Sequence, residues 1–405
     1  MERVSILKTN SYEDLVAKLE KLLEPVGGWE AYCKSGDRVL LKPNLIMARP
    51  VAAAVNTHPA LILAVAKLLR DMGCQVAVGD SPGIGSAEGV LRQLGLLSEL
   101  EACGVQVVEL ATPGPVMRGA AMFSGRFKDL RLAKELNEFD RIINLPKLKS
   151  HGQMGITLAT KNLFGCVAGP AKGQWHYTVG RNYTNFARLL VEIAFAVRAD
   201  LHIIDGIVGM DGNGPTHGRA RKLDLLIAGT NPIAVDRVAV AALQLNPAQF
   251  PIFTAADSLG ISGVEMAEIE LSGTPFASCL VDDFQIPALS GLELLFRGHS
   301  GLNRMVASLI RRRLVLDPKI CIDCRKCEKH CPAGAIRFRK PGPAGQLLAH
   351  QDPERVRMHI DPQICIRCCC CQELCPVGAL SIRDPLALKL IQRVINSGGK
   401  KSPSQ

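Results

Sequence analysis

Two cysteine runs near the C-terminus constrain the fold of this chain more than any other feature. Residues 321–332 read CIDCRKCEKHCP and residues 365–376 read CIRCCCCQELCP. In both runs two, two and three residues separate the ligand-spaced cysteines, and a proline follows the last of them. This spacing is typical of 4Fe-4S sites, because three close thiolates cover one face of a cubane and a fourth reaches across. The sequence therefore predicts a small α+β two-cluster ferredoxin-like domain over residues 317–385.

The ligands of each cluster follow from a rule of two-cluster ferredoxins, in which the fourth cysteine of each run binds the other cluster. The rule assigns Cys321, Cys324, Cys327 and Cys375 to cluster one, and Cys365, Cys368, Cys371 and Cys331 to cluster two. Cys369 and Cys370 are left over, and we expect them to pack, with ligand exchange or redox chemistry as the alternative. A structural zinc site is the competing interpretation, but a third close cysteine does not suit one tetrahedral ion.

Composition places the chain among globular proteins with more than one domain. Of its 405 residues 47% are hydrophobic and 21% are charged, so a large core can form without disulfides. Fifteen cysteines then indicate metal or redox chemistry in a reducing compartment. The charged N-terminus does not suit a signal peptide, and no run reaches the roughly 18 apolar residues of a membrane span. We expect a soluble, cytoplasmic protein with no transmembrane segment.

Positive charge is concentrated around the cysteine runs. The formal net charge is +10, and residues 286–341 contain twelve Arg and Lys against four Asp and Glu. Only 4% of the residues are aromatic and no nucleic-acid reader motif is present, so no nucleic-acid partner is expected. The charge would offset the negative clusters or dock an acidic electron donor or acceptor protein, and a merely solvated face is the alternative.

Before residue 286, short β-branched runs alternate with amphipathic stretches. We expect strands at 39–41, 75–80, 105–110, 141–145, 201–205 and 224–229, and helices at 11–24, 58–73 and 184–199, the first capped by Ser11. The alternation predicts an α/β domain over residues 1–285, with a mostly parallel sheet and flanking helices. Residues 286–316 would form a basic helical linker, for which membrane-surface binding is the alternative, and 386–405 a helical and disordered tail.

Polar side chains follow the expected strands, where ligands of parallel sheets bind. Lysines at a strand end, with glycines that let backbone approach closely, suit a carboxylate or phosphate group. An anionic small-molecule substrate would therefore be bound by Lys42, Asn44, Asp80, Ser81, Lys149, Lys161 and Asn162. His151, Lys147 and Asp205 are the expected catalytic residues, with His151 or Asp205 handling protons.

Each of these residues also has a structural interpretation. Any one lysine is more often a surface cation, and a lone histidine such as His151 is more often held by hydrogen bonds. The glycine-rich loop after Asp205 offers Asp211 and His217 to a divalent metal, but turn chemistry explains its composition as well. Residues 79–89, GDSPGIGSAEG, lack dinucleotide-loop spacing and place Asp80 where pyrophosphate would lie, so no motif indicates a flavin or other organic cofactor.

Two further residues of the α/β part have expected structural roles. Asp236 stands at the start of an expected helix, where exposed amides stabilise a carboxylate. Cys166 is expected to be a small buried apolar residue.

Several long motifs resemble the family catalogued as domain of unknown function 362, often fused to a ferredoxin domain. They are LLKPNL, VGDSPG, INLPKLKSHGQMGITLATKNLFGCV, IDGIVGMDGNGPTHG and IAGTNPIAVDRVA, and they occur in this order over roughly residues 38–260. The resemblance implies the two-domain architecture and iron-sulfur clusters, and it brings no settled reaction.

Three functions are compatible with the sequence. The leading one is an oxidoreductase that passes electrons through two clusters to or from an anionic substrate in the α/β domain. The second is an electron-transfer or maturation accessory protein that serves a protein partner, and the third is a non-redox enzyme with structural clusters. The leading function has a gap, because each cluster carries one electron at a time and no flavin motif supplies a two-electron centre.

Overall fold

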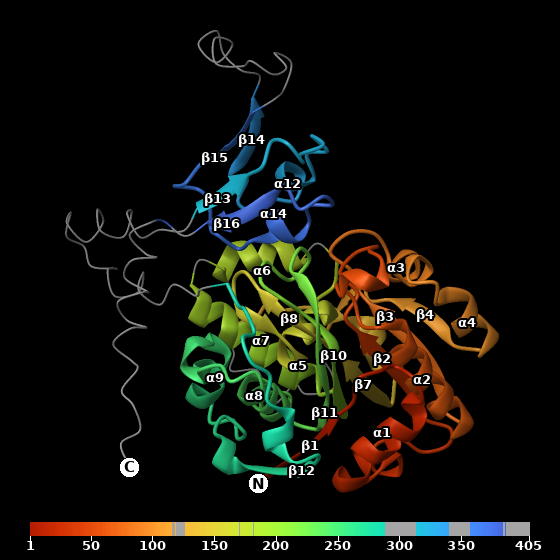
Figure 1. The fold of residues 1–405 in the computed structure, drawn as a ribbon. Helices are drawn as coiled ribbons and strands as arrows, with labels where there is room; N and C mark the ends of the chain where they lie inside the picture. The colour runs from red at the N-terminus through yellow and green to blue at the C-terminus, as the bar shows by residue number, and fades with distance from the viewer. Residues whose placement is uncertain are drawn as a thin grey trace, which may run out of the picture. The chain divides into compact units, whose positions relative to one another are not determined.

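The computed structural model describes residues 1–115, 118, 126–169, 171–180, 182–287, 313–339, 357–383 and 385. The chain divides into two compact units, an α/β unit over Met1–Pro287 and a cysteine-rich unit that follows it (Figure 1). Most of the expected linker at 286–316 and all of the expected tail at 386–405 lie outside the described residues. None of the described helices is long and apolar enough to cross a bilayer.

One mixed, mostly parallel sheet organises the α/β unit (Figure 1). Its main path, in spatial order, is β12 (Ile269–Gly273), β1 (Glu2–Lys8), β11 (Arg219–Gly229), β10 (Leu201–Asp211), β7 (Arg141–Leu145), β2 (Arg38–Pro43), β3 (Gln75–Asp80) and β4 (Gln106–Glu109). Neighbours from β10 to β4 are parallel, as are β12 and β1, whereas β11 runs antiparallel to both β1 and β10. The predicted fold class is confirmed.

A side branch extends this sheet. β8 (Lys147–His151) runs parallel to β10 and pairs antiparallel with β9 (Gly155–Thr157). A separate two-stranded sheet joins β5 (Pro113–Gly114) to β6 (Leu132–Ala133). The branch matters for the site, because it brings Lys147 and Lys149 of β8 against β10.

Helices cover both faces of the sheet, so the central strands are buried on both sides and their sequences are continuous apolar runs. The helices are α1 (Leu15–Leu23), α2 (Pro59–Asp71), α3 (Ala87–Gln93), α4 (Leu97–Ala102), α5 (Ala159–Asn162), α6 (Ala171–Val179), α7 (Tyr183–Val197), α8 (Pro232–Ala242) and α9 (Pro251–Ser258). One core contains Leu19, Leu61 and Val65 of α1 and α2 together with Val39 and Leu41 of β2. Helix α5 packs against α7 and α8 and contacts β7 and β10, and α8 contacts β10 and β11.

Several local predictions were wrong. Ser11 does not cap α1, which begins at Leu15 after Asp14 in a left-handed conformation (φ 47°) without a side-chain cap bond. The loop expected after Asp205 is shorter, because β10 continues to Asp211 and β11 begins at Arg219. β1 and β12 were not predicted, and His58 caps α2 by accepting a hydrogen bond from the Ala60 amide.

The cysteine-rich unit is a repeat with an offset of 44 residues, the difference between Cys321 and Cys365. The first copy contains β13 (Arg313–Leu316), α12 (Lys326–Lys329) and β14 (Ile336–Arg339), and the second contains β15 (Arg357–Ile360), α14 (Cys370–Glu373) and β16 (Leu380–Arg383). The copies exchange strands, because β13 pairs with β16 and β14 with β15. Arg313–Leu316, expected as linker, is thus a strand of this ferredoxin unit.

Candidate functional site

Four adjacent parallel strands bring their polar ends to one edge of the sheet. Lys42 lies near the end of β2, Asp80 ends β3, Asn144 is in β7 and Asp205 is in β10. All four residues are at most 2% exposed. The prediction that these side chains gather beyond the parallel strands therefore describes the observed arrangement, but they lie inside the protein.

Lys42 and Asp80 form a buried ion pair between neighbouring strands. The Lys42 Nζ lies 2.7 Å from Asp80 Oδ1 and donates to the Pro43 carbonyl at 2.9 Å. The other carboxylate oxygen, Oδ2, accepts the Leu45 amide at 2.8 Å. Gly165 packs on this pair so closely that a Cβ there would touch Asp80 Oδ1 and lie 2.6 Å from Lys42 Nζ. The pair is therefore held by the backbone as well as by its own charge.

Lys147 and Asp205 form a second buried ion pair, which uses two of the three predicted catalytic residues. The Lys147 Nζ lies 2.8 Å from Asp205 Oδ2 and donates to Tyr12 Oη at 3.1 Å. Asp205 also accepts the Tyr12 hydroxyl at 2.7 Å and the His58 amide at 2.9 Å. Burial lowers the pKa of Lys147, against the opposing effect of Asp205, and burial also raises the pKa of Tyr12. The Tyr12 ring stacks on His58, with ring centroids 3.6 Å apart.

A chain of asparagine side chains connects Lys149 to Asn144 of β7 by hydrogen bonds. The Lys149 ammonium donates to Asn44 Oδ1 and, at 2.5 Å, to the Val55 carbonyl. Asn44 donates to Asn162 Oδ1 at 2.9 Å, and Asn162 donates to Asn144 Oδ1 at 2.8 Å. Three of the predicted substrate-binding residues, Lys149, Asn44 and Asn162, thus form one internal network.

The remaining predicted residues lie around this network. His151 ends β8, and its Nδ1 accepts the backbone amides of Gln153 and Met154 at 3.0 and 3.1 Å. A nitrogen that accepts two amides carries no proton, so this geometry favours a neutral ring that is protonated on Nε2. Lys161 of α5 is half-buried, with its Nζ 6.0 Å from the Phe164 ring centroid. Ser81 contributes its carbonyl oxygen, described next.

Lys172, a residue that the sequence analysis missed, completes the positive side of the site. It belongs to α6 and donates to the Ser81 carbonyl. Burial is the main reason that its pKa is lowered to about 8, and the nearby Asp80 raises it while Lys42 and Lys161 lower it further. Its only sequence signal is a lysine between small residues in GPAKGQW, which no pattern marks as functional.

Asp236 differs from its predicted setting. It lies inside α8, whose N-terminal cap is Asn231, and its carboxylate accepts the amides of Ala159 and Thr160 at the start of α5. Burial raises the pKa of Asp236 to about 7. Asp236 therefore joins two helices, and the expectation that it begins its own helix was wrong.

The alternative metal site after β10 is occupied by ion pairs. Asp211 lies 2.9 Å from the Arg219 guanidinium and 3.1 Å from that of Arg221, and these partners lower its pKa against the effect of burial. Asp205 is paired with Lys147, and burial lowers the pKa of His217 to about 4. The carboxylates are thus committed to basic side chains, which favours the structural interpretation of this hairpin.

In the ferredoxin unit, the four cysteines assigned to cluster one line a single cavity. Cys321, Cys324 and Cys327 come from the first copy of the repeat, and Cys375 comes from the second. Among the described residues, no three His, Cys, Asp or Glu side chains are placed to hold a single metal ion, whereas a cubane spaces its thiolates farther apart. The donor set therefore fits a 4Fe-4S cluster. Such a cluster supplies one-electron transfer.

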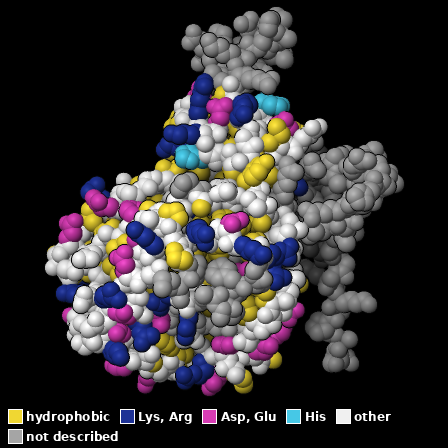
Figure 2. Space-filling model, turned by 180° about the vertical axis from the view of Figure 1, so that it is seen from behind, with side chains coloured by type: hydrophobic (Ala, Val, Ile, Leu, Met, Phe, Trp, Pro, Cys, Tyr) yellow, Lys and Arg dark blue, Asp and Glu magenta, His cyan; other side chains and the backbone are white. Residues whose placement is uncertain are grey.

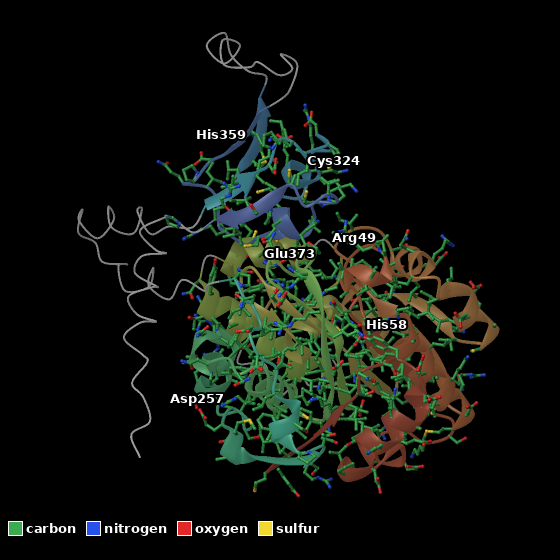
Figure 3. All side chains as sticks on the ribbon, in the orientation of Figure 1. Arg49, His58, Asp257, Cys324, His359 and Glu373 are labelled. Carbon is green, nitrogen blue, oxygen red and sulfur yellow. The ribbon has the colours of Figure 1, made fainter. Side chains whose placement is uncertain are left out.

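The two copies share backbone features that shape a cluster site. The Ala335 amide donates to Cys331 Sγ at 3.3 Å, and the equivalent Ala379 amide donates to Cys375 Sγ at 3.2 Å. Hydrogen bonds to sulfur raise the potential of a cluster by stabilising its more negative, reduced state. Left-handed conformations also recur, at Asp323 and Arg325 in the first copy and at Arg367 and Cys369 in the second. Figure 3 labels Cys324 in the loop before α12.

Cys369 and Cys370 take the repeat positions of Arg325 and Lys326, so the leftover thiols replace two cations. Cys369 is the N-terminal cap residue of α14 and Cys370 is its first residue. In the α/β unit, Cys166 is fully buried and burial raises its pKa to about 12, in keeping with its predicted apolar role.

The mixed α/β sheet and the cysteine cavity define a two-part iron-sulfur protein. The chain belongs to the family described as domain of unknown function DUF362, whose family model matches residues 39–241, and a 4Fe-4S dicluster domain matches residues 320–379. It is 40% identical over 325 residues to a thylakoid-associated protein of Synechocystis sp. (strain ATCC 27184 / PCC 6803 / Kazusa), covering 78% of this chain and 97% of that relative. The iron-sulfur domain indicates electron transfer.

Two solved structures show weak likeness. The lactate racemase apoprotein of Thermoanaerobacterium thermosaccharolyticum is 13% identical with a TM-score of 0.34, over 57% of this chain and 54% of that one. A protein of Thermotoga maritima is 15% identical with a TM-score of 0.32, over 50% and 52%. The chain spans about half the length of each, and neither likeness carries an argument about function.

Proposed function

We propose that this protein exchanges electrons between its two clusters and a small anionic molecule, a carboxylate or a phosphate, bound beside Lys172. The observation that carries the proposal is the charge around Lys172. Besides burial, the nearby charges of Lys42 and Lys161 lower the pKa of Lys172, and Asp80 is the opposing carboxylate. Since like charges gathered in a half-buried site are costly, an anion that neutralises them would bind favourably.

The proposal moves the ligand contacts away from the predicted catalytic residues. Lys147 and Asp205 saturate each other, and His151 Nδ1 is occupied by two amides. These side chains would then position the strand ends, and Lys172 and Lys161 would contact the ligand. Two clusters can together hold two electrons, which matches the demand of most organic reductions without a flavin.

Anion binding to the cluster-loaded protein tests the proposal. Calorimetry would use inorganic phosphate and a panel of small di- and tricarboxylates on the wild type, on Lys172→Gln and on the matched variant Lys128→Gln. Lys128 is an exposed lysine of the same unit. We expect one class of anion to bind the wild type and Lys128→Gln equally, and Lys172→Gln about tenfold more weakly. Equal binding by Lys172→Gln and the wild type would contradict the proposal.

A second function is favoured by the internal contacts of Lys147, Asp205 and His151 Nδ1. If these residues only stabilise the sheet edge, the protein would deliver electrons to a protein partner without small-molecule chemistry. Absence of binding for every anion tested, with both clusters present and reducible, would support this alternative. The cytoplasmic location stays a proposal, and the thylakoid association of the relative makes a membrane surface the other candidate location.

A further inference from the structure

We infer that a small acidic electron-carrier protein docks on the ferredoxin unit over the cluster-one cavity. The docking surface, called the port face, consists of Ile322, Arg325 and Val377, which line the cavity, and of Lys329, an exposed residue of α12. The inference depends on the electron-transfer role of the clusters and is independent of the anion proposed for the α/β unit. In the encounter one electron passes between the carrier and the protein, and no bond forms or breaks.

The port face exposes apolar side chains at the rim of the cavity. Ile322 is 62% exposed and Val377 is 37% exposed, and both line the cavity together with the four cysteines. Cys324 is itself exposed. Large exposed apolar side chains beside a functional site are typical of protein contacts, which have an apolar centre and a polar rim. A carrier seated here would reach the edge of the thiolate site directly.

Positive charge is concentrated in the copy of the repeat that carries this apolar centre, and the second copy supplies an internal comparison. Residues 313–339 contain seven Arg and Lys against three Asp and Glu, a net charge of +4. The equivalent residues 357–383 contain three against two, a net charge of +1. Arg325 and Lys329 have Cys369 and Glu373 as their repeat equivalents. Shared ancestry or cluster neutralisation would act on both copies, so the excess on one copy points to a partner that approaches that copy.

Arg325 is held at the rim by local geometry. It lines the cavity, it precedes α12 with a left-handed backbone (φ 55°), and its guanidinium carbon lies 5.6 Å from the Phe338 ring centroid. Its Nε lies 3.5 Å from Asp323 Oδ1, and half of its side chain remains exposed. A cation fixed in this way can meet a carboxylate of a partner with little loss of side-chain entropy. Figure 2 shows Lys, Arg and hydrophobic side chains together on the described surface of this unit.

The exposed apolar side chains, the positive charge and the cysteine cavity together fit an acidic electron carrier better than the other possible binding partners. A second copy of this chain would present the same positive face and be repelled. An anionic membrane would satisfy the cations but has no use for a redox centre at the middle of the contact. Only a negatively charged redox protein uses the apolar centre, the positive rim and the cavity at once.

The test uses the full, cluster-loaded chain and an acidic two-iron ferredoxin as the probe. The affinity would be measured by interferometry, and the rate of electron transfer by stopped flow, at about 20 mM and about 500 mM salt. Arg325→Gln with Lys329→Gln removes two positive charges from the port face. Arg383→Glu, at the far end of β16, changes the net charge by the same two units and serves as the matched control. Iron content and the electron paramagnetic resonance spectrum establish that the clusters are intact in every variant.

At low salt we expect the double variant to bind the ferredoxin about tenfold more weakly, with a parallel fall in electron-transfer rate, and Arg383→Glu to stay within about twofold of wild type. At high salt the three proteins should converge, because rim charges are screened. Equal loss in Arg383→Glu, or no loss in the double variant, would overturn the inference. So would a double variant that loses binding to phosphatidylglycerol vesicles while its ferredoxin affinity is unchanged, because the cations would then serve a membrane.

Discussion

Replacing Asp205 by Asn should destabilise the α/β unit by about 3–4 kcal/mol, and the figure follows from its contacts. The substitution leaves the Lys147 ammonium, whose side chain is 1% exposed, without its 2.8 Å counter-ion. Breaking a buried pair by removing one partner costs about 3–5 kcal/mol. Asn keeps one oxygen to accept the Tyr12 hydroxyl or the His58 amide, which places the expected cost at the lower end. Since a domain has only about 5–15 kcal/mol to lose, the change is large.

The double variant Lys147→Met with Asp205→Leu separates the effect of the buried charge on stability from the effect of side-chain packing. An apolar pair of similar volume removes the uncompensated charge, so most of the loss should be recovered. The Tyr12 hydroxyl and the His58 amide would still lose their acceptor, which leaves a deficit of about 2 kcal/mol. As a control, Glu88→Gln breaks the exposed pair with Arg92, where the side chains are 53% and 66% exposed, and should change stability by less than about 0.5 kcal/mol.

Urea unfolding followed by tryptophan fluorescence measures these differences, because Trp29 is buried in the core of the α/β unit. The reasoning would be refuted if Asp205→Asn unfolded within 1 kcal/mol of the wild type. It would equally fail if the double variant were less stable than the single one. In the first case the pair would not be structural, and the catalytic assignment of Lys147 and Asp205 would regain its support.

Three further predictions concern the pH response, the packing of the site and the clusters. Burial lowers the pKa of His202 to about 3, so below pH 6.5 the folded protein binds fewer protons than the unfolded chain. The contribution of His202 to the free energy of unfolding should therefore fall by about 1.4 kcal/mol for each pH unit that the pH drops. Denaturation at several pH values should show this slope in the wild type and not in His202→Gln. Gly165→Ala should lower the free energy of unfolding by about 1–3 kcal/mol in the same urea assay, because the added Cβ contacts the Lys42–Asp80 pair. Gly173→Ala, where the added Cβ meets open space on α6, should be neutral or stabilising. Equal effects of the two substitutions would contradict the packing argument. Cys375→Ala, which leaves no ligand atom at this position, should reduce bound iron from about eight to about four per chain and alter the spectrum of the cluster held by the first run. Unchanged iron would exclude Cys375 as a required ligand.

The fold could be predicted from sequence where burial leaves a local trace. β2, β3 and β7 are buried on both faces, so their apolar runs stand out between polar ends. β8 was missed because KLKSH reads as a polar turn, although all five of its residues are buried. Its lysines are tolerated there only because distant residues supply oxygens, as Asp205 does for Lys147 from 58 positions away. No local pattern carries that information.

The gathering of polar side chains at one edge of the sheet could be predicted from the sequence, whereas the contacts of those side chains could not. The rule that parallel strands place their carboxyl ends together gathers Lys42, Asp80 and Asp205 correctly. Spacing says nothing about whether such side chains face solvent or each other. The pairing of Lys42 with Asp80 depends on register between β2 and β3, and the nearness of Lys172 depends on how α6 lies across that edge. Both depend on the tertiary structure, which no local sequence pattern specifies.

The repeat gives the ferredoxin unit a physical reason to bind both clusters together. Cys375 belongs to the second copy but lines the cavity of the first three cysteines, and the strands are exchanged in the same sense, β13 with β16 and β14 with β15. Filling the cluster-one cavity therefore joins the two copies through bonds to iron as well as through the sheets. Because metal binding of this kind contributes folding free energy, each cluster stabilises the chain that supplies ligands to the other. The charge difference between the copies would then direct a partner to the basic copy, and that partner would meet a unit whose two copies are already held together.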